Sequence, residues 1–239
     1  MHQALVQSCD VYFYKVAEKL GINSLSKYMK DFGFGSRSGI GIEEHSGVAP
    51  SREWKQKRFK KPWYQGETIV SAIGQGYVNV TPLQVVMMTA AVANGGVLLK
   101  PTLVKKAVTY SGETSIEYSV NIRTQIPVDS EMLAHIQDAL VGVVNDPGGT
   151  GWRARFSDFL VAGKTGTAQV VSLDTKGEGV QYKDHAWFTS YAPADKPQIA
   201  VTVLIEHGGQ GGVVAAPIAK QIIRAYIKLL KEKNADDNA

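Results

Sequence analysis

The residues best suited to chemistry interrupt an apolar run in the last third of the chain. Lys164, Thr165, Gly166 and Thr167 lie within "FLVAGKTGTAQVV", residues 159–171. On a predicted strand, they supply one ammonium group, two hydroxyls and a glycine that allows close approach of another backbone. We expect an extended peptide to dock along this strand edge, with its carboxylate bound by Lys164 and the threonine hydroxyls.

A second polar cluster, Ser8-Cys9-Asp10, lies near the start of the chain. As local structure it is compatible with a helix N-terminus that Ser8 or Asp10 caps. Cys9 is the one cysteine, so it forms no internal disulfide and no metal site alone. A buried apolar thiol is the favoured interpretation of Cys9, and a metal ligand in a larger protein is the alternative. We expect no cofactor and no metal in this chain.

The elements around the lysine run are predicted as three strands and a closing helix. The strands cover residues 160–171, 186–193 and 198–207, and a short turn containing Pro197 makes the last two antiparallel neighbours. A helix over residues 213–231 follows, with one apolar face. This face comprises Val214, Ile218, Ile222, Tyr226 and Leu229. The fold class is therefore α+β, an antiparallel sheet backed by helices.

The first two thirds of the chain are predicted as mostly helical. Apolar spacing predicts a helix over residues 2–20 that Gly21 ends, and a second helix over residues 23–35. The other helices are expected at residues 81–94, a buried helix with Thr-Pro at its start, and at 128–149, an amphipathic one. Residues 36–70 are expected to be irregular, and residues 97–128 to form extended segments and turns.

Composition limits the classes of protein that fit. The 239 residues are 44% hydrophobic with a net charge of +4. Much of the positive charge lies in "WKQKRFKKPW", residues 54–63, for which a solvated loop with aromatic anchors is favoured over a polyanion site. No nucleic-acid motif accompanies it, so no nucleic-acid partner is expected. The sequence has no long apolar run of the kind that crosses membranes and no signal-peptide pattern.

Taken together, several segments resemble a known family. "QSCDVYFYKVAEKLGI", "WKQKRFKKPWYQGETI", "IGQGYVNVTPLQ", "GKTGTAQV" and "WFTSYAP…PQIAVTVLIEHGG" are similar to the transpeptidase domain of class B penicillin-binding proteins, especially the elongation type. The resemblance implies the penicillin-binding-protein/β-lactamase-like transpeptidase fold. It assigns residues 1–232 to the C-terminal part of that domain, N-terminally incomplete, and leaves residues 233–239 as a polar tail.

The family's catalytic elements are Ser-x-x-Lys, Ser-x-Asn and Lys-[Thr/Ser]-Gly. Ser8-Cys9-Asp10 matches the second, with Asp10 in place of asparagine, and Lys164-Thr165-Gly166 matches the third. The resemblance implies that Ser8 relays protons and that Lys164, Thr165 and Thr167 bind a stem-peptide or β-lactam carboxylate. It also implies that the Thr167 backbone N–H forms half of an oxyanion hole.

The nucleophilic Ser-x-x-Lys is expected upstream of this chain. The literal match Ser24-Leu25-Ser26-Lys27 follows the second motif, and about one such match is expected by chance. We therefore expect the isolated chain to be inactive and to fold properly only with its missing part. Acylation of Ser24 or another local serine by a fluorescent penicillin would overturn this hypothesis.

The function that the resemblance implies is peptidoglycan D,D-transpeptidation during cell elongation, through an acyl-enzyme on D-Ala-D-Ala stems. A D,D-carboxypeptidase, a serine β-lactamase and a non-catalytic fragment that binds wall peptide or partners are the alternatives. Implied partners are the peptidoglycan stem peptide, β-lactam antibiotics and a membrane glycan polymerase. The implied location is the periplasmic face of the bacterial inner membrane, with the anchor outside this chain.

Overall fold

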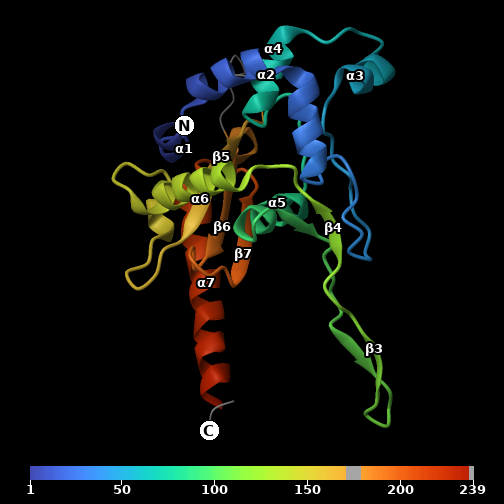
Figure 1. Cartoon of the computed structure of the whole chain (residues 1–239). Coiled ribbons are helices and arrows are strands. Elements are labelled where there is room, and N and C mark those ends of the chain that lie inside the picture. Colours follow the sequence, from blue (N-terminus) through green and yellow to red (C-terminus); the bar gives the residue numbers. More distant parts are fainter. Residues whose placement is uncertain (171–178, 237–239) are drawn as a thin grey trace.

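The computed structural model describes residues 1–170 and 179–236 (Figure 1). The α-helices are α1 (His2–Val6), α2 (Asp10–Asp31), α3 (Arg52–Phe59), α4 (Gln65–Ala72), α5 (Pro82–Ala93), α6 (Ser130–Asn145) and α7 (Gly211–Asp236). The strands are β1 (Val97–Leu99), β2 (Lys106–Val108), β3 (Thr114–Glu117), β4 (Ile122–Gln125), β5 (Ala162–Ala168), β6 (His185–Ala192) and β7 (Ile199–Ile205). Short 3-10 helices cover Trp152–Ala154 and Val180–Tyr182.

The central sheet is antiparallel in the order β5-β6-β7, which confirms the three predicted strands and the α+β class. Lys164 lies opposite Thr189 in the β5–β6 register. Val171, the last residue of the first predicted strand, lies outside the described residues. The lysine run is thus on a strand that has β6 on one side and the helical part of the molecule on the other.

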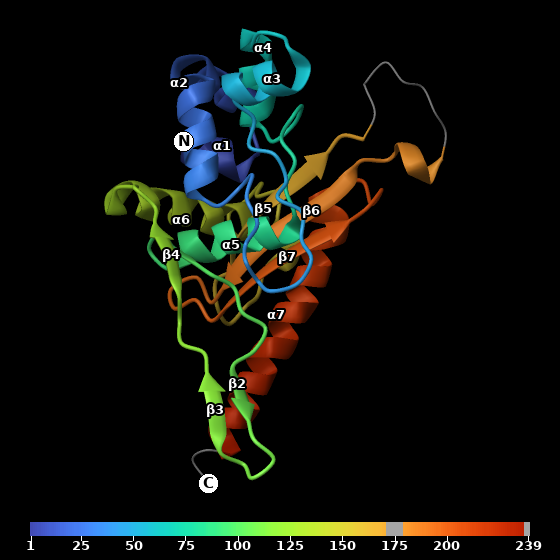
Figure 2. The ribbon, with the colours of Figure 1, turned by 90° about the vertical axis from the view of Figure 1, so that its right-hand side faces the viewer.

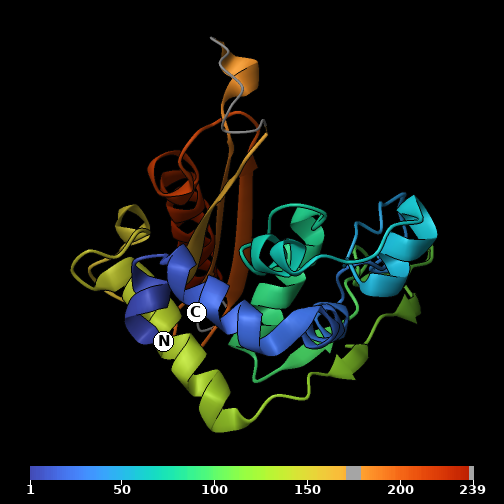
Figure 3. The same ribbon diagram turned by 90° about the horizontal axis from the view of Figure 1, so that it is seen from above.

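Helices cover both faces of the sheet. Helix α7 lies on one face and α5 on the other, while α6 packs against β5 (Figure 3). The core between α7 and the sheet includes Phe188, Ala216 and Ile223, none of which is exposed. Because α6 and α7 are held by this apolar core, they fix the position of β5.

The first predicted helix, over residues 2–20, is interrupted by a turn in the structure. Helix α1 ends at Val6, and α2 begins at Asp10 after a turn in which Ser8 has φ 54°. The end at Gly21 is confirmed as a non-helical residue within α2, with φ 72° and ψ 162°. Apolar spacing did not reveal the turn because Val11, Val16 and Leu20 continue the pattern but are exposed.

The expectation of an irregular segment over residues 36–70 is wrong for its second half, which contains α3 and α4. Ser51 caps α3 by accepting a hydrogen bond from the Trp54 N–H, and Glu67 belongs to a capping box at the start of α4. Lys55 is 2% exposed and pairs with Glu67. The loop interpretation is therefore wrong, because one lysine of the basic run is a buried structural residue.

Two helices match their predicted capping signals. Thr81 accepts from the Gln84 N–H at the start of α5, with Pro82 as the first helical residue. Asp129 accepts from the Glu131 and Met132 N–H groups at the start of α6. The expected burial of α5 is confirmed by Met87 and Ala91, which lie in a second apolar cluster.

The predicted extended region between α5 and α6 forms two small antiparallel sheets. Strand β1 pairs with β4, and β2 pairs with β3. The β2–β3 hairpin projects from the body as an arm (Figures 1 and 2). Every residue of β3 is exposed.

Helix α7 differs from its prediction in both extent and buried face. It runs from Gly211 to Asp236, so residues 233–236 of the predicted polar tail are helical, and residues 237–239 lie outside the described residues. Its buried residues are Gly211, Ala215, Ala216, Ala219 and Ile223. Of the predicted apolar face, Val214 and Ile218 pack against the core, whereas Ile222 and Leu229 are exposed.

Within residues 1–170 and 179–236, no helix combines the length and apolar character needed to cross a membrane.

Candidate active site

A cleft of about 1370 Å³ brings the predicted site residues together. Ser8 and Asp10 line it from the α1–α2 turn, and Lys164 to Thr167 line it from β5. Further walls come from the start of α7, the loop after α6 and the loop after α4. Segments far apart in sequence therefore meet in one concave site.

The contact at the centre of the cleft joins the two sequence clusters. The Lys164 ammonium donates a hydrogen bond to Ser8 Oγ at 2.8 Å, and a second one to the Thr165 carbonyl at 3.0 Å. The two residues of the first contact are 156 positions apart. A proton can pass directly between this lysine and the serine hydroxyl.

The backbone at Ser8 is in a conformation that L-residues other than glycine rarely adopt. Its φ of 54° places it in the left-handed region, between the end of α1 and Cys9, the residue that caps α2. Such conformations persist where the surroundings hold them, and they are frequent at functional sites. The turn directs the Ser8 hydroxyl to Lys164.

Burial lowers the pKa of Lys164 to about 8. Removal from water disfavours the charged form, and the nearby Asp10 carboxylate opposes this effect by favouring it. The lysine is therefore close to balanced between its charged and neutral forms near neutral to mildly alkaline pH. In the charged form it attracts a carboxylate, and in the neutral form it accepts a proton.

Two side-chain contacts show to which side the backbone carbonyl groups of Thr165 and Thr167 on β5 point. Gln75 Nε2 donates to the Thr167 carbonyl at 3.0 Å, and Lys164 donates to the Thr165 carbonyl. In an antiparallel strand, the N–H and C=O of one residue point to the same side. The N–H groups of Thr165 and Thr167 therefore point away from β6, toward the cleft.

Gln75 and Thr150 are site residues that the sequence reasoning missed. Gln75 lies after α4, in a segment quoted for its family resemblance but given no role, and it binds the end of β5. The hydroxyls of Thr150 and Thr165 lie 2.8 Å apart. The Thr165 hydroxyl, expected to bind a substrate carboxylate, thus already has a partner. The Pro-Gly-Gly turn before Thr150 was the signal available in the sequence.

The literal Ser-x-x-Lys match does not form a catalytic pair at the cleft. Its Lys27 bonds Asp31 at 2.7 Å, and this hydrogen bond raises the lysine pKa from its ordinary value. Ser24 is not among the residues that line the cleft. A lysine held in its charged form is a poor general base, which agrees with the expectation that this match arises by chance.

Cys9 is exposed, so the favoured interpretation of a buried thiol is wrong. The turn that orients Ser8 also turns Cys9 outward. Among residues 1–170 and 179–236, no three His, Cys, Asp or Glu side chains are grouped closely enough to hold a metal ion.

The fold and the site define a class of protein. A Lys-Thr-Gly strand at the edge of an antiparallel sheet, facing a serine from a helix turn, is the arrangement that the sequence resemblance implied for penicillin-recognising transpeptidase folds. Comparison with solved structures supports this class. The chain is similar to Pseudomonas aeruginosa PBP2 in complex with WCK 5153, with a TM-score of 0.79, 38% identity and coverage of 94% of this chain and 48% of that one.

Sequence comparison supports the same class of protein. Residues 1–224 match the family described as the penicillin binding protein transpeptidase domain, and the chain belongs to this family. It is 44% identical to the peptidoglycan D,D-transpeptidase MrdA of Haemophilus influenzae, over 95% of this chain and 36% of the relative. It is also similar to PBP2 of Helicobacter pylori, solved as a complex with MreC, at 33% identity and a TM-score of 0.78, covering 94% of this chain and 39% of that one.

The chain spans about a third of the length of the curated relatives it matches.

Proposed function

We propose that this chain forms one wall of the active site of a peptidoglycan D,D-transpeptidase of cell-wall elongation. The reaction forms an acyl-enzyme on a D-Ala-D-Ala stem peptide and then transfers the acyl group to an amine. The observation that carries the proposal is the hydrogen bond from Lys164 to Ser8, within a cleft that Thr167 also lines. The similarity to MrdA enzymes supports the elongation type.

Lys164 binds the terminal carboxylate of the stem peptide or the carboxylate of a β-lactam. Its ammonium is at the cleft surface of β5, and Thr167, which is exposed, is three residues further along the strand. Charge-assisted hydrogen bonds of this kind are stronger than neutral ones. Thr165 contributes through its backbone, because its hydroxyl is bonded to Thr150.

Ser8 relays a proton between the catalytic lysine of the Ser-x-x-Lys element and the leaving or attacking amine. Its hydroxyl accepts from Lys164, which leaves the hydroxyl proton free to be donated into the cleft. Asp10, which also lines the cleft, favours the charged form of Lys164 and so maintains the carboxylate-binding state.

The Thr167 N–H supplies one donor to the developing oxyanion. Its direction follows from the bond between Gln75 and the Thr167 carbonyl. Such a donor stabilises the transition state by about 3–4 kcal/mol in serine acyl transfer. Gln75 therefore helps to orient the Thr167 N–H, although its side chain bonds the carbonyl of Thr167.

The attacking serine belongs to a Ser-x-x-Lys segment outside the 239 residues. Of the described serines, Ser8 and Ser71 line the cleft, and Ser71 is 4% exposed, whereas Lys27 of the literal match is held by Asp31.

The partners follow from the same function. A related PBP2 was solved with MreC, which supports a role within a protein assembly. A membrane glycan polymerase is the further partner that the family resemblance implies. Peptidoglycan is the substrate, so the site faces the periplasmic side of the inner membrane.

The experiment places this chain in a complete relative. In the chimera, residues 1–239 replace the matching segment of the Haemophilus influenzae MrdA, and a fluorescent penicillin reports acylation. We expect the chimera to be labelled and Lys164→Ala to slow labelling at least 100-fold. A folded chimera that stays unlabelled beside a labelled parent would contradict the proposed function.

A second assay separates the transpeptidase from its alternatives. The chimera receives a D-Ala-D-Ala peptide with and without an amine acceptor, and hydrolysis and aminolysis products are quantified. More aminolysis than hydrolysis supports the transpeptidase, whereas water as the main acceptor would identify a carboxypeptidase or β-lactamase relative.

A further inference from the structure

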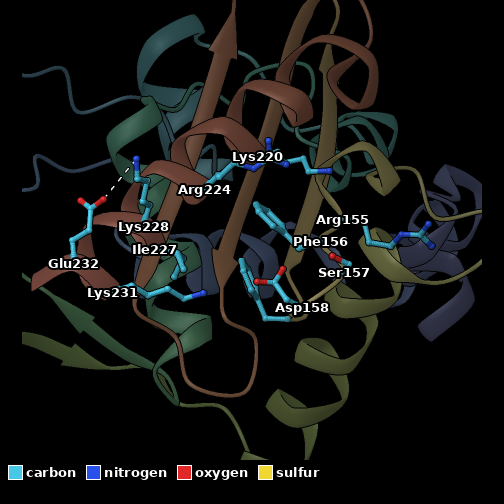
Figure 4. A pocket seen from close by; sticks show the side chains of 11 residues that line it. Arg155, Phe156, Ser157, Asp158, Lys220, Arg224, Ile227, Lys228, Lys231 and Glu232 are labelled. Carbon is cyan, nitrogen blue, oxygen red and sulfur yellow. Dashed lines mark ion pairs between the residues drawn. The ribbon is translucent and has the colours of Figure 1, made fainter. Parts of the chain in front are cut away.

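A second cavity, of about 840 Å³, lies between the C-terminal half of α7 and the loop of residues 155–159 (Figure 4). Its lining contains five cationic side chains and two carboxylates. The cations are Arg155, Lys220, Arg224, Lys228 and Lys231, and the carboxylates are Asp158 and Glu232. The cavity therefore carries an excess of positive charge that the proposed acyl-transfer chemistry does not use.

The cations of α7 form one row along the helix. Lys220, Arg224, Lys228 and Lys231 are spaced by four, four and three residues, which places them on one face. At 1.5 Å per residue, the row is about 16 Å long. An extended peptide of about five residues has this length.

The cationic row is largely free to bind an anion. Lys228 lies 3.6 Å from Glu232, whereas Lys220, Arg224 and Lys231 make no ion pair with any residue that the structure describes. Glu232 is thus partly neutralised, and the remaining cations face the cavity without a carboxylate partner of their own.

The floor of the cavity is aromatic. The Phe156 and Phe159 rings are stacked with centroids 4.5 Å apart, and the Lys220 ammonium lies 5.3 Å from the Phe156 ring centroid. The Arg224 guanidinium carbon lies 5.7 Å from the same centroid. A ligand that combines carboxylates with an apolar side chain can use both the cations and the rings.

We propose that this cavity, the α7 basic groove, binds an extended acidic segment of a partner protein, about five residues long and containing an apolar side chain. Charge complementarity selects the carboxylates, and the length of the row selects an extended chain over a single small anion. The concave shape disfavours a flat membrane surface. Arg155 lines both this groove and the active-site cleft, so the partner docks beside the catalytic centre.

The test measures binding of a fluorescein-labelled six-residue peptide of alternating glutamate and phenylalanine, with a glutamine-for-glutamate peptide as control. Anisotropy is recorded with the chimera at about 50 mM salt. We expect the acidic peptide to bind the chimera, the control peptide to bind at least tenfold more weakly, and higher salt to weaken binding because screening increases.

Matched variants locate the site. Lys220→Glu with Arg224→Glu is expected to weaken binding at least tenfold, whereas Lys57→Glu with Arg58→Glu makes the same charge change on α3 and leaves affinity within twofold. Thermal unfolding confirms that both variants are folded. Equal loss in both pairs, or no loss in the α7 pair, would overturn the proposal.

Competitors test the identity of the partner. Inorganic phosphate at constant ionic strength, vesicles with one quarter phosphatidylglycerol, and soluble peptidoglycan fragments are expected not to displace the peptide. Displacement by any one of them would overturn the assignment to a protein segment. Peptide binding is measured without acylation. A negative result for the groove therefore leaves the proposed transpeptidase function standing, and the reverse also holds.

Discussion

At the scale of single residues, the chemistry that we propose for the cleft depends on the pair formed by Lys164 and Ser8. The sequence identified both members, because Lys-Thr-Gly and Ser-x-Asp are short motifs with defined order. It did not reveal the left-handed turn at Ser8, the lowered pKa of Lys164 or the contribution of Gln75. These depend on burial and on contacts between distant segments, which residue order alone does not encode.

The pKa of Lys164 gives a pH prediction. Its charged form, which we propose binds the carboxylate, predominates below the pKa of about 8 and is lost as pH rises above it. We expect the affinity of the chimera for a penicillin carboxylate to fall above pH 8, approaching tenfold per pH unit. Noncovalent affinity measured with a slowly acylating β-lactam checks this. Lys164→Arg, whose side chain stays charged, serves as the control, and a flat wild-type profile up to pH 10 contradicts the assignment.

Two substitutions of Ser8 separate its proposed catalytic role from the backbone strain at this position. Both Ser8→Ala and Ser8→Gly remove the hydroxyl, so each is expected to slow penicillin labelling of the chimera by about 100-fold or more. Only glycine relieves the φ of 54°, so the glycine variant should be about 1 kcal/mol more stable than the alanine variant. Labelling kinetics and urea unfolding measure the two effects. Full activity in either variant would remove Ser8 from the proton relay.

At the scale of elements, sequence patterns predicted the last third of the chain better than the region before it. The β5, β6 and β7 strands and the capped helices α5 and α6 follow directly from alternation and capping residues. Helices α3 and α4 were missed, because charge obscured their apolar contacts. The buried face of α7 was predicted in part: Val214 and Ile218 pack against the core, but most of the fully buried residues of the helix are small.

One ion pair joins α3 to the start of α4, with its lysine buried and its glutamate partly buried. Lys55 lies within 6 Å of three aromatic ring centroids, those of Trp63, Tyr64 and Tyr77, and it pairs with Glu67. Lys55→Ala leaves Glu67 without its cation, and we expect a loss of about 3 kcal/mol in unfolding free energy. Urea unfolding of the chimera measures this loss.

The matched substitution on the same helix is Lys57→Ala, at an exposed position. It is expected to change the unfolding free energy by less than about 0.5 kcal/mol. Equal effects of Lys55→Ala and Lys57→Ala would show that the buried pair is not what holds α3 to α4.

At the scale of the whole molecule, the β2–β3 arm projects from the body of the structure (Figures 1 and 2). The candidate active-site cleft and the α7 basic groove are lined by residues outside this arm and share Arg155. The arm pairs only within itself, and β3 is exposed throughout. Replacing residues 105–118 by a short Gly-Ser linker should therefore change the unfolding free energy by less than about 1 kcal/mol. Ile223→Ala, in the core under α7, should cost about 2–5 kcal/mol in the same assay. A larger loss for the arm than for Ile223 would show that the arm contributes to the core.

The reaction that we propose for this cleft is acyl transfer from a D-Ala-D-Ala stem peptide to an amine. The most direct measurement follows D-alanine release and incorporation of a labelled D-amino acid when the chimera is incubated with a D-Ala-D-Ala peptide. We predict that incorporation exceeds hydrolysis and that Lys164→Ala reduces both by at least 100-fold in a folded protein. A folded chimera that releases no D-alanine, or a Lys164→Ala variant that retains the wild-type rate, would contradict the account.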